Sequence, residues 1–293
     1  MSTSKSIILI TGANTGLGLL TAKLLSSSPS SSTSPKHYHI ILTSRSLSSA
    51  EHAIATLTPP LGPPGPPNTT TFSALELDVT NPEAVERAVT YVEREFGYLN
   101  VLVNNAGVSP KLGGLRKDAE VAMGVNFVGG VGMTEACREL LRKGRGVGRE
   151  GTIASHSIPP FFVVGKGAQK LTPPSHRTAP RIIYLSSGLG SIAIASDPTD
   201  PFYNLDVTAY RASKAAINML AVQQAKILGK EGIMVFAVDP GWRATGLSGD
   251  AAAAKARGAG DPEGGAQVVV DVVEGRRDAD VGKLVHEGGV HPW

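Results

Sequence analysis

The sequence predicts a doubly wound α/β fold, in which helices cover both faces of a mostly parallel, seven-stranded sheet. Seven short runs are apolar at nearly every position, and this pattern is typical of strands buried on both faces. The segments between these runs have the periodicity of amphipathic helices, so strands and helices alternate along the chain. Such an alternating order is typical of parallel sheets.

The elements follow in order from these patterns. The predicted strands are residues 7–10, 40–42, 72–77, 99–103, 181–185, 234–238 and 283–285. The predicted helices lie near residues 16–27, 47–57, 82–96, 118–143, 208–229 and 262–274. The third helix has the clearest start signal, because Asn81 can cap it and Pro82 suits its first position.

Three stretches lack this periodicity and are interpreted as surface insertions into a single domain that spans residues 1–293. Residues 26–36 are rich in Ser and Pro, residues 58–71 in Pro, Gly and Thr, and residues 144–180 mix Gly, Pro and basic side chains. Within the third stretch, residues 158–164 are apolar enough to pack as a flap or contact surface. No segment that could form a second core remains.

Composition excludes several classes of partner. The chain has 293 residues, of which 41% are hydrophobic and 18% charged, and it can bury a sizeable core. A net charge of +3 without a dense Lys/Arg block argues against nucleic acid and against an acidic membrane surface. The single cysteine, Cys137, indicates a packed thiol in a reducing compartment. The first apolar run is too short for a signal sequence or a membrane span, so we expect a cytoplasmic protein.

Tyr210 and Lys214 stand four residues apart in a stretch with helical periodicity, so a helix would place both on one face. An ammonium beside a phenol favours the phenolate and brings its pKa closer to the pH at which proton transfer is useful. The pair is therefore a candidate acid–base site. A buried tyrosine that packs against its neighbours in the helix is the alternative interpretation.

A Gly-rich stretch, residues 11–18, directly follows the first predicted strand and opens the first helix. Glycines let the backbone approach a pyrophosphate, and a helix N-terminus offers free N–H groups and a positive dipole end. This context favours the dinucleotide-binding turn of a Rossmann fold, although the Gly-x-x-x-Gly-x-Gly spacing differs from the commoner fingerprint. Its candidate cofactor-binding residues are Gly12, Asn14, Thr15, Gly16, Leu17 and Gly18.

Three more clusters of polar residues and glycine follow later strands. They are Asn104-Asn105-Ala106-Gly107, Ser186-Ser187-Gly188 and Asp239-Pro240-Gly241-Trp242. The carboxyl ends of parallel strands meet at one edge of an open α/β sheet, where such folds bind their ligands. In this order, and with the Tyr–Lys pair, the clusters resemble the short-chain dehydrogenase/reductase superfamily in its single-domain branch. The resemblance runs from about Ser6 to Trp293, apart from the three insertions.

The resemblance implies an oxidoreductase with four catalytic residues. Asn126 would hold a water in a proton relay, and Ser187 would orient the substrate. Tyr210 would be the acid–base group, and Lys214 would bind the nicotinamide ribose and lower the pKa of the tyrosine. Further cofactor contacts are implied for Asp78, Val79, Asn105, Ala106, Gly107, Pro240, Gly241 and Thr245, in addition to Tyr210 and Lys214. Of these, Asp78 would contact the adenine and Asn105 would lie beside the adenosine ribose.

Two features depart from compact family members. Ser187 and Tyr210 are 23 residues apart, and the added residues should overhang the site. Phe202 and Tyr203 in this segment could form an apolar substrate wall with Trp242, or could pack within their own loop. The adjacent Ser186 is the alternative to Ser187 as the working hydroxyl. The second departure is the long insertion at residues 144–180, before the fifth strand, which could displace Ser186 and Ser187.

Charge at the end of the second strand favours NADP(H). Ser44 and Arg45 lie there without an acidic neighbour, and such groups suit a ribose 2′-phosphate better than a free 2′-OH. The alternative is that Arg45 only solvates the strand end. The histidines near the C-terminus, His286 and His291, lack the spacing and the further ligands of a metal site, so no metal is expected.

The leading hypothesis is an NADP(H)-dependent oxidoreductase that acts on a small carbonyl or alcohol substrate. An NADP(H)-binding regulatory or sensor protein without turnover, or an NAD-dependent dehydrogenase of the same fold, are the alternatives. Members of the family usually pair through their helices, so a homodimer or homotetramer is also possible. The substrate and the direction of the reaction do not follow from the sequence.

Overall fold

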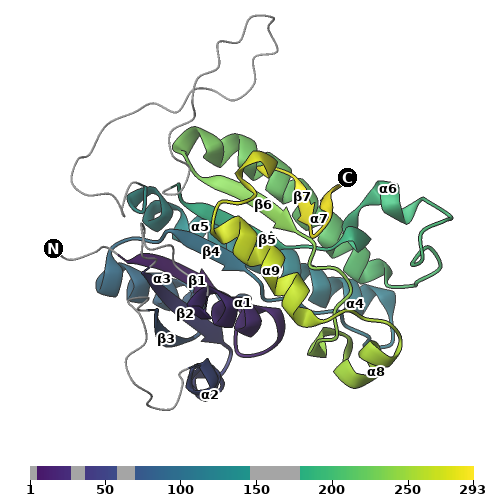
Figure 1. Cartoon of the computed structure of the whole chain (residues 1–293), viewed down its shortest axis with the longest axis horizontal. Coiled ribbons are helices and arrows are strands. Elements are labelled where there is room, and N and C mark those ends of the chain that lie inside the picture. The colour runs from purple at the N-terminus through teal and green to yellow at the C-terminus, as the bar shows by residue number, and fades with distance from the viewer. Residues whose placement is uncertain (1–4, 28–36, 58–69, 146–178) are drawn as a thin grey trace, which may run out of the picture.

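The computed structural model describes residues 5–27, 37–57, 70–145 and 179–293, which form one eight-stranded sheet between two layers of helices (Figure 1). The strands are β1 (Ser6–Ile10), β2 (Tyr38–Ser44), β3 (Thr71–Glu76), β4 (Val101–Asn104), β5 (Arg181–Leu185), β6 (Met234–Val238), β7 (Leu284–His286) and β8 (Gly289–His291). Across the sheet they lie in the order β3-β2-β1-β4-β5-β6-β7-β8. The strand order switches between β1 and β4: β2 and β3 are added on one side of β1, and β4 to β8 on the other. Folds of this class bind their ligands at this switch point.

All seven predicted strands are present, and these seven pair in parallel. The predicted total of seven is corrected to eight, because β8 turns back and pairs antiparallel with β7. This strand has only three residues and begins at the second of two glycines, so it carries no periodic signal. The predicted fold class, a mostly parallel doubly wound sheet, is confirmed.

The main helices begin and end close to the predicted residues. They are α1 (Gly16–Ser27), α2 (Leu47–Leu57), α3 (Pro82–Phe96), α4 (Leu115–Ala122), α5 (Gly129–Lys143), α7 (Thr208–Leu228) and α9 (Pro262–Val273). Asn81 caps α3 as predicted, and its side chain accepts hydrogen bonds from the N–H groups of Glu83 and Ala84. The single helix predicted near 118–143 is divided, because a π-helical turn, η1 (Met123–Val128), joins α4 to α5. The short helices α6 (Ile192–Ala195) and α8 (Ala251–Ala256) were not predicted.

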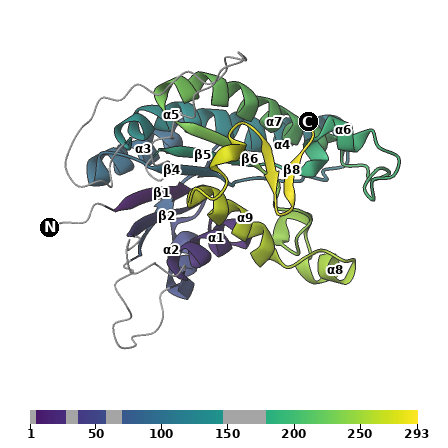
Figure 2. The ribbon, with the colours of Figure 1, turned by 45° about the horizontal axis from the view of Figure 1, so that its top comes forward.

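The two faces of the sheet have separate hydrophobic cores. Helices α3, α5 and α7 cover one face, and α1, α2 and α9 cover the other (Figure 2). Alternate strand residues point to opposite faces, so that Leu9 lies in the first core and Ile8 in the second. Double coverage explains why these strands are apolar at nearly every position. No helix in the described ranges is long and apolar enough to cross a bilayer.

Most of the three predicted insertions, including residues 158–164, lies outside the described residues. At two of their ends, residues predicted to be part of an insertion belong to a regular element instead: Ser27 is the last residue of α1, and Thr71 is the first residue of β3. The assignment of residues 1–293 to a single domain with insertions stays a prediction. The long third stretch does not displace the fifth strand, because β5 pairs in register with both β4 and β6.

Candidate active site

The predicted binding clusters meet at the carboxyl edge of the central strands. The N–H of Thr11, after β1, donates to the carbonyl of Val103 in β4 at 3.0 Å. The N–H of Ser186, after β5, donates to the carbonyl of Val238 in β6 at 2.7 Å. These bonds continue the sheet pairing past the strand ends, so segments far apart in sequence are brought to one edge.

The Gly-rich turn after β1 is shaped by close packing on the turn after β4. Gly12 and Gly16 have φ values of 60° and 59°, which favour glycine. A Cβ on Gly18 would lie 2.6 Å from Asn105 Nδ2 and 2.9 Å from the Cα of Ala13. Asn105 Nδ2 itself donates to the carbonyls of Thr11 at 2.8 Å and Gly12 at 2.9 Å. Asn105 therefore braces the turn, a role that the sequence did not suggest; its contact with a ribose stays a prediction.

The open side of this turn fits an anionic dinucleotide. The first turn of α1 carries no acidic side chain, so the positive end of the helix dipole is not neutralised there. A Cβ on Gly16 would point toward Thr245, whose Cβ would be 3.9 Å away. Thr245 comes from the segment after β6, so the structure brings together two residues predicted to border the cofactor. Asn14 and Leu17 are half-buried in the turn, and Thr15 is exposed.

The edge of the sheet beside β2 holds the residues predicted to bind the adenosine part. Ser44 is buried at the end of β2, and the next residue, Arg45, is exposed. Asp78 accepts hydrogen bonds from the N–H and hydroxyl of Thr80, at 2.9 and 2.7 Å. These bonds, together with the charge of Arg45, lower the pKa of Asp78. Val79, next in the chain, packs at the border of the first core.

Asn126 links three segments of the site. It lies in η1 and is 4% exposed. Its Oδ1 accepts from the N–H of Val108 at 2.8 Å, and its Nδ2 donates to the carbonyl of Val108 and to Ser213 Oγ, both at 2.9 Å. A Cβ on Gly107 would lie 3.3 Å from Asn126 Oδ1 and 3.7 Å from Lys214 Nζ. Asn126 and Lys214 are therefore neighbours across Gly107, as a shared site requires.

Lys214 is a buried cation on α7. Its side chain is 4% exposed, and Nζ donates to the carbonyl of Leu185 at 2.6 Å. Nζ lies 5.4 Å from the centre of the Tyr210 ring. Burial lowers the pKa of Lys214 to about 8, and the charge of Asp239 opposes this effect.

The predicted lowering of the Tyr210 pKa is not found. Burial raises the pKa of Tyr210 well above its usual value, the charge of Asp239 adds to this rise, and a hydrogen bond with Ser187 opposes it. The Lys214 ammonium lies 5.4 Å from the ring centre and donates to a backbone carbonyl, and its charge is not among the effects that shift the pKa of Tyr210. Tyr210 is accordingly a protonated phenol at neutral pH.

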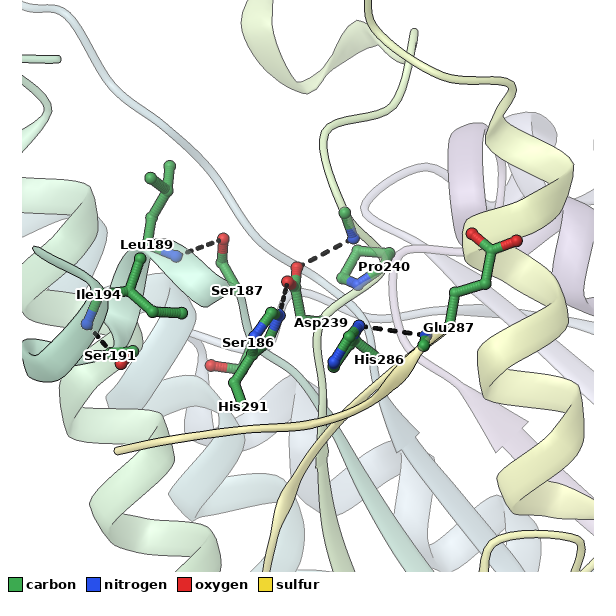
Figure 3. A network of polar contacts seen from close by, with 12 residues as sticks. Ser186, Ser187, Leu189, Ser191, Ile194, Asp239, Pro240, His286, Glu287 and His291 are labelled. Carbon is green, nitrogen blue, oxygen red and sulfur yellow. Dashed lines mark hydrogen bonds and ion pairs between the residues drawn. The ribbon is translucent and has the colours of Figure 1, made fainter. Parts of the chain in front are cut away.

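The two serines after β5 have different hydrogen-bond partners in the structure. Ser187 accepts from the N–H of Leu189 at 3.1 Å (Figure 3), and its side chain lies close enough to Tyr210 to oppose the rise of the phenol pKa. Ser186 is buried and donates to Asn218 Oδ1 on α7 at 2.5 Å. Of the two serines, Ser187 is the one near Tyr210, and its choice as the working hydroxyl stays a prediction. Its role in orienting a substrate stays a prediction.

The segment after β6 contributes aromatic and acidic groups. Gly241 has a φ of 76°, which suits the tight turn after Pro240. The rings of Phe202 and Trp242 meet edge to face, with centroids 5.8 Å apart, so two of the three residues of the predicted wall are in contact. Asp239, which was not predicted as a site residue, is 7% exposed beside Tyr210 and Lys214. The signal in the sequence that could have pointed to Asp239 is an acidic residue directly after an apolar strand.

The pKa of Lys214 predicts how stability depends on pH. Its folded-state pKa of about 8 lies below the ordinary value of 10.5, so between these values the unfolded chain binds more protons than the folded protein. Stability therefore rises with pH across this window. We expect the wild type to gain stability relative to Lys214→Met as pH rises, measured by urea unfolding at several pH values. A difference that is independent of pH would contradict this.

Comparison with known proteins points to one family. Residues 6–156 match the family model for short chain dehydrogenases. A short-chain dehydrogenase/reductase of Phoma sp is 32% identical over 308 residues, which cover 99% of this chain and 98% of the relative. Carbonyl reductase (NADPH) 1 of Rattus norvegicus is 26% identical, with 100% of each chain covered. The solved structure of the carbonyl reductase Sniffer of D. melanogaster matches with a TM-score of 0.69 and 25% identity, over 99% of this chain and 100% of that one.

Proposed function

This chain belongs to the short-chain dehydrogenase/reductase family, and we propose that it is an NADP(H)-dependent oxidoreductase that interconverts a carbonyl compound and its alcohol. The observation that carries the proposal is the convergence of Ser187, Tyr210, Lys214 and Asn126 at the ligand-binding edge of the sheet. Four residues from three separate segments would not need to meet there in a protein that only binds a nucleotide. The bound nicotinamide would supply or accept the hydride.

The protonation state of Tyr210 supports carbonyl reduction. A carbonyl oxygen that gains a hydride becomes an alkoxide and needs a proton. Because burial and Asp239 raise the pKa of Tyr210, its hydroxyl carries a proton to donate at neutral pH. Ser187 would hydrogen-bond the same oxygen and hold it beside the phenol. Lys214 would keep a positive charge near the developing phenolate.

The chain's own residues support NADP(H) over NAD(H). Arg45 is exposed at the end of β2 and carries a charge that suits a 2′-phosphate. Its charge also lowers the pKa of Asp78, so the two side chains lie near each other at this edge. The relative from Rattus norvegicus is named as an NADPH enzyme, which agrees with this choice.

Replacing Arg45 with Ala is expected to weaken NADPH binding by about tenfold or more, because a charge-assisted bond to the phosphate is lost. Binding of NADH should change little, since it has no 2′-phosphate. Dissociation constants measured by cofactor fluorescence check this, with the exposed Arg116→Ala on α4 as the matched control. Equal weakening for both cofactors would contradict the assignment.

An NADPH-consumption screen across ketones, aldehydes and quinones tests the proposed function. Turnover that needs Tyr210 supports it. Faster turnover with NADH would favour an NAD-dependent dehydrogenase. Tight NADPH binding without turnover, together with capture of a partner, would favour the regulatory alternative. The substrate is proposed to be a small molecule; a cytoplasmic location and a homo-oligomer also stay predictions.

A further inference from the structure

The C-terminal hairpin reaches the candidate active site through Asp239. Oδ2 of this residue lies 2.8 Å from Nε2 of His291 in β8, and Oδ1 accepts from the N–H of Gly241 at 2.9 Å (Figure 3). Burial favours the neutral acid, but the hydrogen bonds and the charge of His291 outweigh it and lower the pKa of Asp239. The carboxylate is therefore ionised at neutral pH and can only accept, so Nε2 of His291 must carry a hydrogen.

The orientation of His291 is set by the rest of the hairpin. Its ring stacks on that of His286, with centroids 3.9 Å apart and planes 12° apart. His286 Nδ1 accepts from the N–H of Gly288 at 3.2 Å, which fixes the His286 ring. The guanidinium of Arg277 donates to the carbonyls of His286 and Gly289, at 3.0 and 2.5 Å, and so joins the two strands.

Asp239 also lies near enough to the catalytic groups to act on them through its charge. Its charge raises the pKa of Tyr210 and opposes the lowering of the Lys214 pKa. A Cβ on Gly188, directly after Ser187, would lie 3.0 Å from Asp239 Oδ2 and 3.3 Å from His291 Nε2. The serine loop and the carboxylate thus lie close together, and a side chain at position 188 would crowd both Asp239 and His291.

Other charged groups near the pair do not shift the pKa of the tyrosine. His286 in β7 stacks behind His291, and burial together with the charge of His291 lowers its pKa. The charges of Arg277 and Glu287 act on His286 in opposite directions. Glu287 is also paired with Arg243 at 2.8 Å. Among the charged side chains of the described residues, Asp239 is the one that shifts the pKa of Tyr210.

We infer that Asp239 and His291 are a positioning pair, in which a hydrogen bond from His291 holds a buried carboxylate against the loop of Ser187, near Tyr210. The inference rests on the proposed function, in which Tyr210 is the acid–base group. A fixed negative charge disfavours the phenolate and keeps the tyrosine able to donate a proton over a wider pH range. The hydrogen bond from His291 offsets part of that charge, so the two residues act as one unit.

The test compares Asp239→Asn, His291→Phe and the double variant with the wild type. Phe retains a ring that can stack on His286 but removes the donor to Asp239. Glu287→Gln is the matched control, because it removes one negative charge from the same hairpin without a contact to Tyr210. Two readouts are used: the pH midpoint of alcohol oxidation with NADP⁺, and the titration of Tyr210 in the cofactor-free protein by NMR of ring-labelled tyrosine, assigned with Tyr210→Phe.

Asp239→Asn should move both midpoints to lower pH by about 1 unit, because the repulsive charge is gone. His291→Phe should move them to higher pH by a smaller amount, because the remaining charge is less compensated. The double variant should match Asp239→Asn, since His291 acts through Asp239. Glu287→Gln should leave both midpoints unchanged.

Loss of stability or activity in Asp239→Asn without a shift of either midpoint would show that the pair is only structural, and would overturn the inference. Additive shifts in the double variant would also overturn it. If the wild type reduces no carbonyl compound but the NMR midpoints shift as expected, the proposed function fails while the charge coupling stands. If the wild type turns over normally and neither midpoint shifts in the variants, the proposed function stands and the charge coupling fails.

Discussion

Tyr210→Phe is expected to lower kcat for carbonyl reduction by about 10³-fold, because the variant keeps the ring but has no proton to donate to the forming alkoxide. The dissociation constant for NADPH should stay within about threefold, since the phenol oxygen is one contact among many. Single-turnover kinetics and cofactor fluorescence measure the two quantities separately. A loss in kcat with unchanged binding is the signature of an interaction made in the transition state.

Tyr91→Phe is the matched control for this prediction. Tyr91 lies on α3, half-buried against Phe96 and away from the carboxyl edge of the sheet. The same loss of one hydroxyl there should leave kcat and NADPH binding unchanged. Near-normal turnover in Tyr210→Phe would remove the tyrosine from the mechanism, and an equal loss in Tyr91→Phe would point to a general effect on folding.

Asp278→Ala is expected to lower the free energy of unfolding by about 3 kcal/mol, because it removes a counterion from a buried guanidinium. Arg181 opens β5 and is 2% exposed, and its NH2 lies 3.0 Å from Asp278 Oδ1. Its Nε donates to the carbonyl of Val273 at the end of α9, at 3.3 Å. The guanidinium therefore joins the sheet to the helix layer, and it is left buried without its counterion when the carboxylate is removed.

Urea unfolding of Asp278→Ala measures this loss. The control is Glu120→Ala, which breaks an exposed pair with Arg116 on α4 and should cost less than about 0.5 kcal/mol. Since Arg181 lies at the opposite end of β5 from Ser187, kcat of the folded variant should be unchanged. A loss below about 1 kcal/mol would show that the remaining hydrogen bonds of Arg181 suffice.

Most of the fold could be predicted because its signals are local. An apolar run buried on both faces, a capped helix start at Asn81 and a Gly-rich turn after β1 are each contained within a few residues. The elements that escaped prediction lack such signals. β8 has three residues, and the π-helical turn that contains Asn126 looks like continuous helix in the sequence.

The sequence could predict which site residues lie close together where a motif within one element fixes their spacing. Tyr210 and Lys214 lie on one helix, so their proximity follows from helical geometry. The choice between Ser186 and Ser187 needed the structure, because it depends on which hydroxyl faces Asn218 and which faces Tyr210. Asn105 was predicted as a cofactor contact, but its role in bracing the Gly-rich turn depends on a contact across 94 positions of sequence.

By itself, the sequence determined the fold class, the order of the Gly-rich and polar turns, and the closeness of Tyr210 to Lys214, since each depends on neighbours along the chain. Only the tertiary structure decided the electrostatics of that pair. The pKa of Tyr210 is raised rather than lowered because burial and Asp239 act on it, and neither follows from its neighbours on the helix. His291 reaches Asp239 across 52 positions, and a contact between side chains so far apart is formed only by the folded sheet.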